Sequence, residues 1–446
     1  MNKIEVTQSR TVQGTQFDFS VKNLRPIQNE PFSVPYLDQA AMMIFTPHDI
    51  VLAGEKFPII QKWDDVAKEL LNLDNMQKSE KEAKNKAKEL AEKLPDVHKK
   101  AQAIYDYIQQ NIVSSNVIGV ALGRTADELL KVKRGDPDEI NALFVTMLKE
   151  AKVDADMVLL ATQNWQTLAR EFPNISQFSR IITRLNFKEG AIFADPADPA
   201  APFGELPWFD RGVVGLAVKG TKVQEVMIPA GSPEDNLSTT SATLQVAKNW
   251  TTEGDSEIEL KGAEAIDFRD DLLEEAPEKL EQRLTDYFAV GHSDAEVSHV
   301  VHPDLKNSSQ PFILKAHIRG RLTNEAGPSE LLLNPWLDDQ YERPLFKSTV
   351  RHSAVRFNNP EKRISTSIWQ LAPEIKVVQL PKEVKIDNDL GGFSHSCAQN
   401  GSTVTCTRMY YLKKMFLQTT AEYMNARKFF DEIAKHDQEV VVLRGQ

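Results

Sequence analysis

The sequence predicts an α+β fold, because helical and strand-like patterns occur in separate blocks along the chain. Between residues 61 and 150 apolar residues recur mainly at helical spacing, and from 155 to 222 they recur at the spacing of strands. After residue 222 the pattern is mostly β and is interrupted by two helices. Helices followed by a cluster of strands predict helices packed on one face of an antiparallel sheet.

Length and composition limit the classes of protein that fit. A chain of 446 residues exceeds the size at which a single core keeps growing, so two or three domains are expected. A net charge of −11 without a basic patch argues against nucleic-acid binding. No apolar run approaches the roughly 18 residues of a transmembrane helix, so no membrane-spanning segment is expected. No cofactor is predicted.

Residues 1–60 are predicted to contain one or two strands, with Thr15–Val21 the clearest, followed by an extended segment that five prolines interrupt. Such a segment cannot bury a core alone. It is interpreted as the end of an N-terminal β domain and a strap that lies over the next domain. The first ten residues lack the apolar core of a secretory signal, so the protein is either cytosolic or begins after a removed signal.

Residues 61–222 are predicted to form the second domain, in which helices precede strands. The run of alternating Lys and Glu at 78–93 is interpreted as the solvated face of a helix. Helices are expected at Trp63–Leu94, Val97–Ile112 and Thr125–Lys131, and strands at Met157–Ala161, Ser179–Phe187, Ala191–Asp195 and Val213–Val218.

A loop-to-helix junction at residues 133–149 is the most sharply marked element of this domain. Asp136 suits the N-cap, Pro137 suits the first helical position, and Glu139 stands where a capping-box carboxylate reaches back. An apolar stripe follows at i, i+3, i+4, i+7 and i+8, which predicts a buried helix: Ile140, Leu143, Phe144, Met147 and Leu148.

Residues 223–446 are interpreted as a β-sandwich-like domain with a docked C-terminal helix. Strands are expected at Ala242–Trp250, Glu257–Ala265, Phe312–Leu322, Ser329–Leu333 and Ile375–Leu380, and helices at Pro277–Val290 and Thr420–Lys435.

The only two cysteines, Cys397 and Cys406, flank a hairpin turn signal at Asn400-Gly401. Facing cysteines across a hairpin can form a disulfide, which would imply an oxidising compartment. Two reduced strand cysteines fit the sequence equally well, and the alternatives stay open.

The order of several landmarks resembles bacterial transglutaminase-like proteins with a papain-type core. The landmarks are Ile104-Tyr-Asp-Tyr-Ile, Gly135-Asp136 before the amphipathic helix, a strand that ends in Phe193-Ala-Asp195-Pro196, and Phe203-Gly-Glu-Leu-Pro207. Residues 23–31 look like the exit from the β-sandwich domain that usually precedes this core, and residues 422–443 look like the end of the domain of unknown function that usually follows it. The resemblance therefore covers almost the whole chain.

The catalytic triad of that family is degenerate in this sequence. The family places a nucleophilic cysteine after Gly-Asp at the helix N-terminus, where the dipole and a histidine lower the thiol pKa. Here Pro137 occupies that position, Arg180 stands where the resemblance implies the histidine, and only Asp195 matches the third member. No histidine lies between His98 and His292, and no cysteine precedes Cys397. A Cys–His acyl-enzyme mechanism in this domain is therefore excluded by composition.

Two other uses of the polar residues were weighed. Asp136, Asp138, Glu139, Asp195 and Asp198 could gather around a hard cation, but helix capping explains Asp136, Asp138 and Glu139 without a metal, so no metal is expected. An ion pair between Arg180 and Asp195 would replace the His–Asp pair of the family and seal its catalytic cleft. If Arg180 points inward, a carboxylate should meet it, because a buried arginine left unpaired is costly.

His292, His299 and His302 are interpreted as surface or loop histidines rather than a zinc site. Their spacing is loose, and an odd separation puts His299 and His302 on opposite faces of a strand.

Two functions from different classes follow. The first is a non-catalytic transglutaminase-like protein that binds or scaffolds a protein, peptide or envelope polymer; the resemblance implies a periplasmic or secreted location. The second is a hydrolase that uses a carboxylate pair, Asp195 with Asp138 or Glu139, which requires those groups within about one water of each other and facing a cavity.

Overall fold

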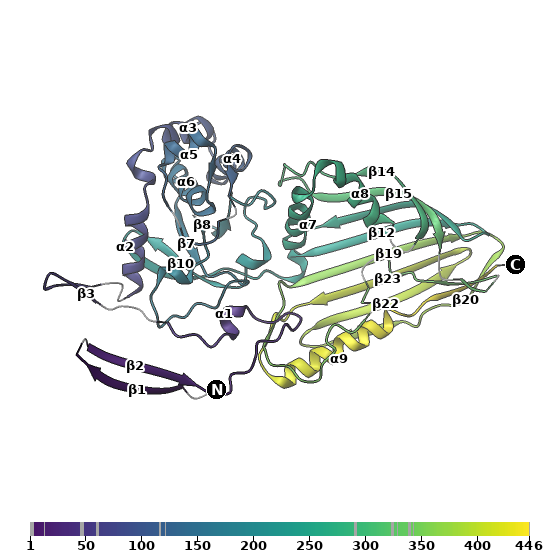
Figure 1. Cartoon of the computed structure of the whole chain (residues 1–446). Helices are drawn as coiled ribbons and strands as arrows, with labels where there is room; N and C mark the ends of the chain where they lie inside the picture. The colour runs from purple at the N-terminus through teal and green to yellow at the C-terminus, as the bar shows by residue number, and fades with distance from the viewer. Residues whose placement is uncertain are drawn as a thin grey trace.

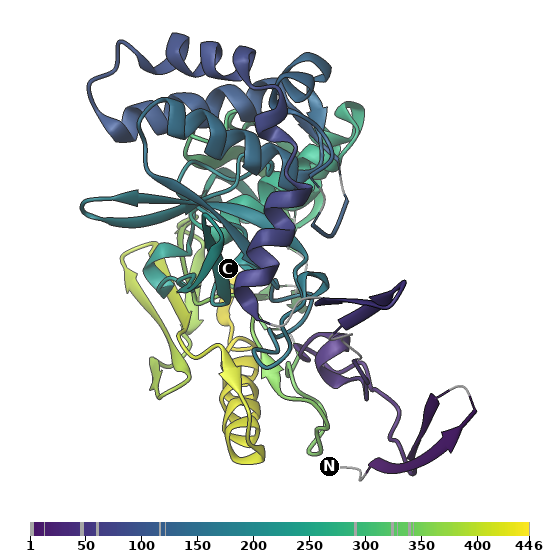
Figure 2. The same cartoon turned by 90° about the vertical axis from the view of Figure 1, so that its left-hand side faces the viewer.

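The computed structural model describes residues 4–12, 14–44, 49–58, 62–115, 117–120, 122–289, 292–322, 325–327, 329–337, 340–341 and 343–445. It contains a core domain with a five-stranded sheet, a C-terminal domain with an eight-stranded sheet, and an N-terminal hairpin that stands away from both (Figures 1 and 2). None of the described helices is long and apolar enough to cross a membrane.

The core domain is an antiparallel sheet with helices on one face, as the sequence predicted. All six residues of the middle strand are buried, because that strand is covered on both faces. In the order β11-β10-β7-β8-β9 the strands are β11 (Lys222–Met227), β10 (Val214–Lys219), β7 (Ala155–Leu160), β8 (Arg180–Phe187) and β9 (Gly190–Ala194). The domain boundary predicted at residue 222 therefore falls at the start of β11.

Five helices pack together with this sheet around the main core cluster of the domain (Figure 2). All five residues of the predicted apolar stripe from Ile140 to Leu148 are buried in that cluster. The helices are α2 (Trp63–Leu73), α3 (Lys81–Ala91), α4 (Val97–Asn111), α5 (Ala126–Val132) and α6 (Pro137–Glu150). A short parallel pair, β5 (Val113–Ser114) and β6 (Arg134–Gly135), lies beside the start of α6.

The helical stretch predicted from Trp63 to Leu94 is broken into two helices, so the prediction of one continuous element is wrong. Asp74 ends α2 in an extended conformation, and its carboxylate accepts a hydrogen bond from the Met76 backbone N–H at 2.8 Å. A 3₁₀ turn at Met76–Lys78 then leads to α3. In α3 the alanines Ala83, Ala87 and Ala91 are buried, so the Lys and Glu residues between them form the solvated face that was predicted.

The C-terminal domain is built on a large mixed sheet in which β12 and β19 are parallel and the other neighbours are antiparallel. In spatial order its strands are β14 (His292–Val301), β15 (Phe312–Leu322), β13 (Thr251–Leu260), β12 (Leu237–Val246), β19 (Glu361–Leu371), β23 (Thr403–Leu412), β22 (Gly391–Asn400) and β21 (Val384–Asp387).

One face of this sheet is covered by several elements, and the alternate residues on the other face are more exposed. A second sheet, β16 (Glu325–Gly327), β17 (Glu330–Leu333), β25 (Val441–Gly445) and β20 (Ile375–Gln379), shares a core with β12, β19 and β23. The helices α7 (Ala263–Glu274), α8 (Pro277–Phe288) and α9 (Thr420–His436) pack elsewhere on the same sheet (Figure 1). Two stacked sheets therefore account for part of the domain, and helices for the rest.

Several elements of this domain differ from the sequence prediction. Residues 263–265, predicted to end a strand, begin α7, because Gly262 at φ +66° turns the chain out of β13. β19 was not predicted. β22 and β23 form the hairpin that the turn signal at Asn400-Gly401 indicated, although their bounds were not predicted. The end of the helix predicted to Val290 lies outside the described residues. The docked C-terminal helix is confirmed as α9.

The N-terminal residues form the hairpin of β1 (Ile4–Thr11) and β2 (Gly14–Val21), then an extended strap with the short α1 (Tyr36–Gln39), and a second small hairpin of β3 (Asp49–Leu52) and β4 (Glu55–Pro58). The strap contacts both domains. Its Glu30 carboxylate accepts hydrogen bonds from backbone N–H groups of His352 and Ser353, next to β18 (Val355–Arg356) and its partner β24 (Phe416–Leu417). Its Asp38 carboxylate accepts from the backbone N–H and hydroxyl of Thr167.

Candidate functional site

The start of α6 is closed by a capping box, as the sequence predicted. The Asp136 backbone N–H donates to Glu139 Oε2 at 3.1 Å, and Pro137 occupies the first helical position. The Ser115 hydroxyl donates to Asp136 Oδ1. Pro137, which stands at the nucleophile position of the transglutaminase-like pattern, has neither a side-chain donor nor a nucleophilic atom.

The first turn of α6 also fastens the surrounding loops. Glu139 is 2% exposed; its carboxylate accepts from the backbone N–H groups of Gly123 and Arg124, at 3.1 and 2.9 Å, and pairs with the Arg124 guanidinium. Asp138 is equally buried, and it accepts from the backbone N–H of Ile181 in β8. Both carboxylates therefore hold parts of the fold together.

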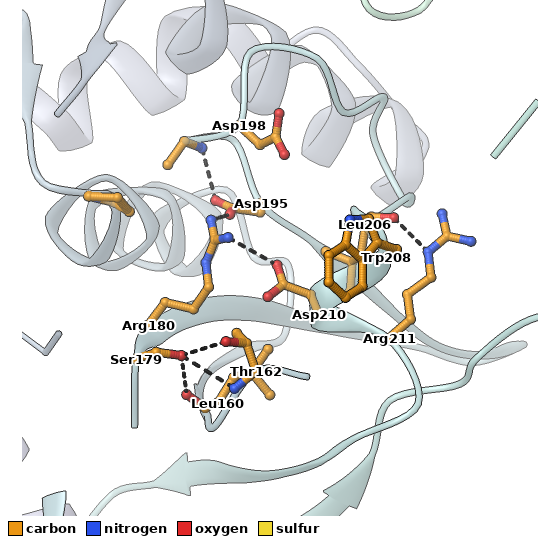
Figure 3. Close-up of polar contacts among 12 residues, drawn as sticks. Leu160, Thr162, Ser179, Arg180, Asp195, Asp198, Leu206, Trp208, Asp210 and Arg211 are labelled. Carbon is orange, nitrogen blue, oxygen red and sulfur yellow. Dashed lines mark hydrogen bonds and ion pairs between the residues drawn. The ribbon is translucent and has the colours of Figure 1, made fainter. Parts of the chain in front are cut away.

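Arg180 and Asp195 form the ion pair that was considered from the sequence (Figure 3). Arg180 opens β8, and Asp195 follows the last residue of β9, so the adjacent strands bring them together. Asp195 is fully buried, and it also accepts from the Asn141 side-chain amide at 2.6 Å and from the Ala197 backbone N–H at 3.0 Å. Every oxygen of this carboxylate is thus occupied by a donor from the protein.

A second buried carboxylate, Asp210, completes the surroundings of Arg180. It ends the 3₁₀ turn Trp208–Asp210, and its Oδ2 lies 3.4 Å from Arg180 Nη1 (Figure 3). The neighbouring Phe209 ring lies 5.2 Å from the guanidinium carbon. Apart from the ion pair, neither oxygen of Asp210 has a hydrogen-bond partner. The sequence reasoning missed this residue, because no spacing rule links position 210 to position 180.

Burial and the neighbouring charges shift the pKa values of Arg180, Asp198 and Asp210. Burial raises the pKa of Asp210 to about 7, and repulsion by Asp195 and Asp198 adds to this, while Arg180 opposes it. Burial also raises the pKa of Asp198 to about 6. Desolvation alone would lower the pKa of Arg180, but Asp210 and Asp195 raise it above its ordinary value. Arg180 therefore stays charged, and Asp210 titrates near neutrality.

The Arg180 guanidinium is enclosed by its two carboxylate partners. Only 16% of the Arg180 side chain is exposed. Two cavities beside the five-stranded sheet, of 320 and 330 Å³, are lined by other residues, among them Leu206 and Arg211 in the first and Leu168 and Arg356 in the second. The Asp198 carboxylate points away from Arg180 (Figure 3), and it accepts from the Ala200 backbone N–H at 2.9 Å.

The five carboxylates considered above as a cation site do not lie together. Within the described residues, Asp136, Asp138, Glu139, Asp195 and Asp198 do not form a group of three or more close ligand atoms. Of the three loosely spaced histidines, His299 and His302 have exposed ring contacts with Ser298 and the Pro303 carbonyl, and the His292 side chain lies outside the described part.

Cys397 and Cys406 are joined in a disulfide. They lie directly opposite each other on β22 and β23, with a Cα–Cα separation of 4.1 Å. Of the two alternatives, the structure therefore contains the bonded one.

Comparison with known proteins places family matches on both domains. Residues 84–177 match the transglutaminase-like superfamily, a segment that includes the start of α6 and ends before Arg180. Residues 329–443 match DUF3858, a domain of unknown function. A search of curated proteins found no significant match.

The fold is similar to the crystal structure of a putative protease from Parabacteroides distasonis ATCC 8503. The TM-score is 0.58 at 13% identity, over 99% of this chain and 68% of that one. This likeness concerns the fold alone. Together with the family matches, it confirms the resemblance that the sequence predicted: the chain carries a transglutaminase-like superfamily domain followed by a DUF3858 domain.

Proposed function

We propose that this chain is a non-catalytic transglutaminase-like protein, a binding or scaffold module of the bacterial envelope. The observation that carries the proposal is the position of Arg180. Where the transglutaminase-like pattern implies a general base, a permanently charged guanidinium lies between Asp195 and Asp210. A guanidinium with a raised pKa cannot accept a proton, so the position does not support base catalysis.

The nucleophile position supports the same proposal. Pro137 replaces the reactive residue, and the only cysteines of the chain are joined to each other far along the sequence. The disulfide also favours an oxidising compartment, which agrees with a periplasmic or secreted location.

The exposed apolar surface favours a protein or peptide as the partner. Sixteen of the 28 large apolar residues that are exposed in the described chain lie before residue 58. In the N-terminal hairpin the directly opposed pairs Ile4–Val21 and Val6–Phe19 share one face, and this hairpin stands clear of both domains (Figures 1 and 2). Contiguous exposed apolar side chains of this kind mark interaction surfaces.

A hydrolase remains the alternative, but the candidate catalytic carboxylates differ from those that the sequence suggested. Asp195, Asp138 and Glu139 are buried rather than exposed, and each is held by backbone N–H groups. In the core domain, the carboxyl groups with a pKa raised toward neutrality are Asp198, to about 6, and Asp210, to about 7. An acid–base role would therefore fall to those two.

Site-specific photo-crosslinking in the producing cell tests the binding role. A photoreactive residue in place of Val6 or Phe19 is expected to form adducts with a second protein. One in place of Met227, an apolar residue of β11 that is more exposed than either, is not. Equal yields at all three positions, or none, would contradict the proposed surface. The catalytic side is tested by assaying the purified chain for amide hydrolysis and acyl transfer, with none expected.

A further inference from the structure

His395, on the covered face of β22, is a buried imidazole without a hydrogen-bond partner. Its side chain is 2% exposed, and it lies between the rings of Trp336 and Phe393, with centroids at 4.5 and 5.6 Å. Neither Nδ1 nor Nε2 has a partner. A neutral imidazole has one N–H donor and one lone pair, and leaving both unused in the interior is unfavourable.

Two further ligand-type side chains come from the end of α9 and the loop after it. His436 is the last residue of α9, and its Nδ1 lies 2.8 Å from Glu439 Oε1. The His395 and His436 rings are 5.9 Å apart, and one ligand atom from each of the three residues lies within 4.8 Å of the other two. The described part of the chain contains no other group of this kind.

We propose that His395, His436 and Glu439 bind a divalent transition-metal ion, most simply Zn²⁺. Two imidazoles and one carboxylate are a donor set that suits zinc and its neighbours in the first transition row, whereas calcium and magnesium require oxygen ligands. A tetrahedral ion with ligand bonds of about 2.0–2.1 Å needs the ligand atoms roughly 3.3 Å apart, so small side-chain rotations close the site. A lone pair of His395 then has a partner.

The surrounding charges favour a cation. Arg408 lies opposite His395 on the neighbouring strand β23. Its positive charge is neutralised by Asp437, whose two carboxylate oxygens accept its hydrogen bonds at 2.7 and 2.8 Å. Glu432 lies 3.8 Å from His436 Nε2 and pairs with Lys435 Nζ at 3.6 Å, so the charge of Glu439 is the one left without a cation partner among these groups. The site therefore has an excess of negative charge before the ion binds.

The ion would join three separate parts of the DUF3858 domain. β22 supplies His395, α9 supplies His436, and the connection to β25 supplies Glu439 (Figure 1). Glu439 is itself held in place, since its Oε2 accepts from the Lys382 backbone N–H at 3.1 Å and its carbonyl accepts from Trp336 Nε1 at 3.0 Å. The Glu439 side chain is 31% exposed and that of His436 17%, so water can reach a fourth ligand position.

The test is a titration of the chelator-treated full chain with Zn²⁺, by calorimetry, and with Co²⁺, by visible absorption. One equivalent of Zn²⁺ is expected to bind and to raise the unfolding midpoint, and Co²⁺ is expected to give the intense absorption of a tetrahedral complex. His436→Gln and Glu439→Gln should each weaken binding at least tenfold while leaving the unfolding midpoint of the metal-free protein within a few degrees. His395→Gln tests the third ligand.

The matched control is His317→Gln. His317 lies 2.8 Å from Asp255 and 3.4 Å from Glu253, but on the exposed face of β15, so it represents adventitious binding by a histidine near carboxylates. Loss of Zn²⁺ binding in this variant with retention in His436→Gln would overturn the proposal. So would the absence of a stoichiometric Zn²⁺ site in the wild type, or a site that Ca²⁺ fills equally well. None of these outcomes depends on the proposed function of the core domain.

Discussion

Arg180 is the residue that links the buried carboxylates of the core domain. It is the only guanidinium paired with the two fully buried carboxylates Asp195 and Asp210 among the described residues, and these reach it from two different segments after β9. The pairing with Asp195 could be anticipated, because the resemblance places both residues at adjacent triad positions. The pairing with Asp210 could not, since only the folded 3₁₀ turn brings residue 210 to residue 180.

Replacing Arg180 by Met should destabilise the protein strongly. The change leaves two buried carboxylates without their cation, and breaking a buried pair in this way costs about 3–5 kcal/mol. Arg170→Met is the control, because Arg170 pairs with Glu225 on the surface and such pairs contribute about 0–1 kcal/mol. Urea unfolding at pH 7.5 measures both; equal losses in the two variants would contradict the role given to Arg180.

The raised pKa of Asp210 predicts a pH dependence of stability. A carboxyl whose folded pKa is about 7, above its ordinary value of 3.8, stabilises the fold when protonated, so its contribution is complete below about pH 4 and is lost as the pH rises to about 7. The slope reaches about 1.4 kcal/mol per pH unit for one group.

Asp210→Asn should therefore flatten the decline of unfolding free energy between pH 4 and pH 7. Asp389→Asn, at an exposed position, should leave the wild-type slope unchanged. Denaturant unfolding across this pH range is the measurement. A wild-type protein whose stability instead rises steadily from pH 4 to pH 7, with the same slope in Asp210→Asn, would rule out the raised pKa.

At the scale of elements, the sequence is most informative where several local signals agree. The start of α6 was predicted down to its N-cap, because capping box, proline and apolar stripe all point to the same residue. The break between α2 and α3 was missed, because only two residues, Asp74 and Asn75, mark it and the pattern on both sides is helical. The β22–β23 hairpin was indicated by its turn signal at Asn400-Gly401, but not the bounds of its strands. α7 and β19 were missed, because the end of β13 and the pairing of β19 with β12 and β23 depend on contacts between distant segments, which periodicity does not report.

The capping box of α6 should contribute more than an ordinary one. Glu139 accepts from residues 123, 124 and 136 while buried, so Glu139→Ala leaves several backbone N–H groups unpaired and should cost about 2–4 kcal/mol. Glu128 holds the same place in the exposed capping box of α5, and Glu128→Ala should cost about 1 kcal/mol or less. Thermal or urea unfolding distinguishes the two variants. A smaller loss of unfolding free energy in Glu139→Ala than in Glu128→Ala would show that Glu139 does not hold the surrounding loops in place.

The disulfide between β22 and β23 gives a prediction that reductant can test. The bond joins cysteines that are nine positions apart in the sequence. For a loop of this length, loop-closure entropy predicts a contribution of about 2–3 kcal/mol to the free energy of unfolding. Dithiothreitol should lower the urea midpoint of the wild type and leave that of Cys397→Ser/Cys406→Ser unchanged. Native protein that is alkylated at both thiols without reductant would show that the bond is absent.

At the scale of the whole molecule, two family domains are joined by a strap and by contacts between them. Asp38 bonds to Thr167 of the core domain, Glu30 bonds to residues 352 and 353 of the C-terminal domain, and Ser308 donates to Gln109 at 2.8 Å across the two. The strap itself was predicted from its prolines. Its partners could not be, because each contact joins residues more than 100 positions apart, and no local rule relates them. The histidine and glutamate cluster of the C-terminal domain also escaped sequence reasoning, because only the packing of α9 on the sheet brings His436 and Glu439 to His395 on β22.

Turnover by the purified full chain tests whether this transglutaminase-like domain catalyses. Peptide-amide hydrolysis and amine incorporation would be followed by mass spectrometry from pH 5 to pH 9, for the wild type beside Asp195→Asn and Asp210→Asn. We expect all three proteins to match the uncatalysed rate and no covalent adduct to form. Turnover by the wild type that is lost in either variant would contradict this expectation.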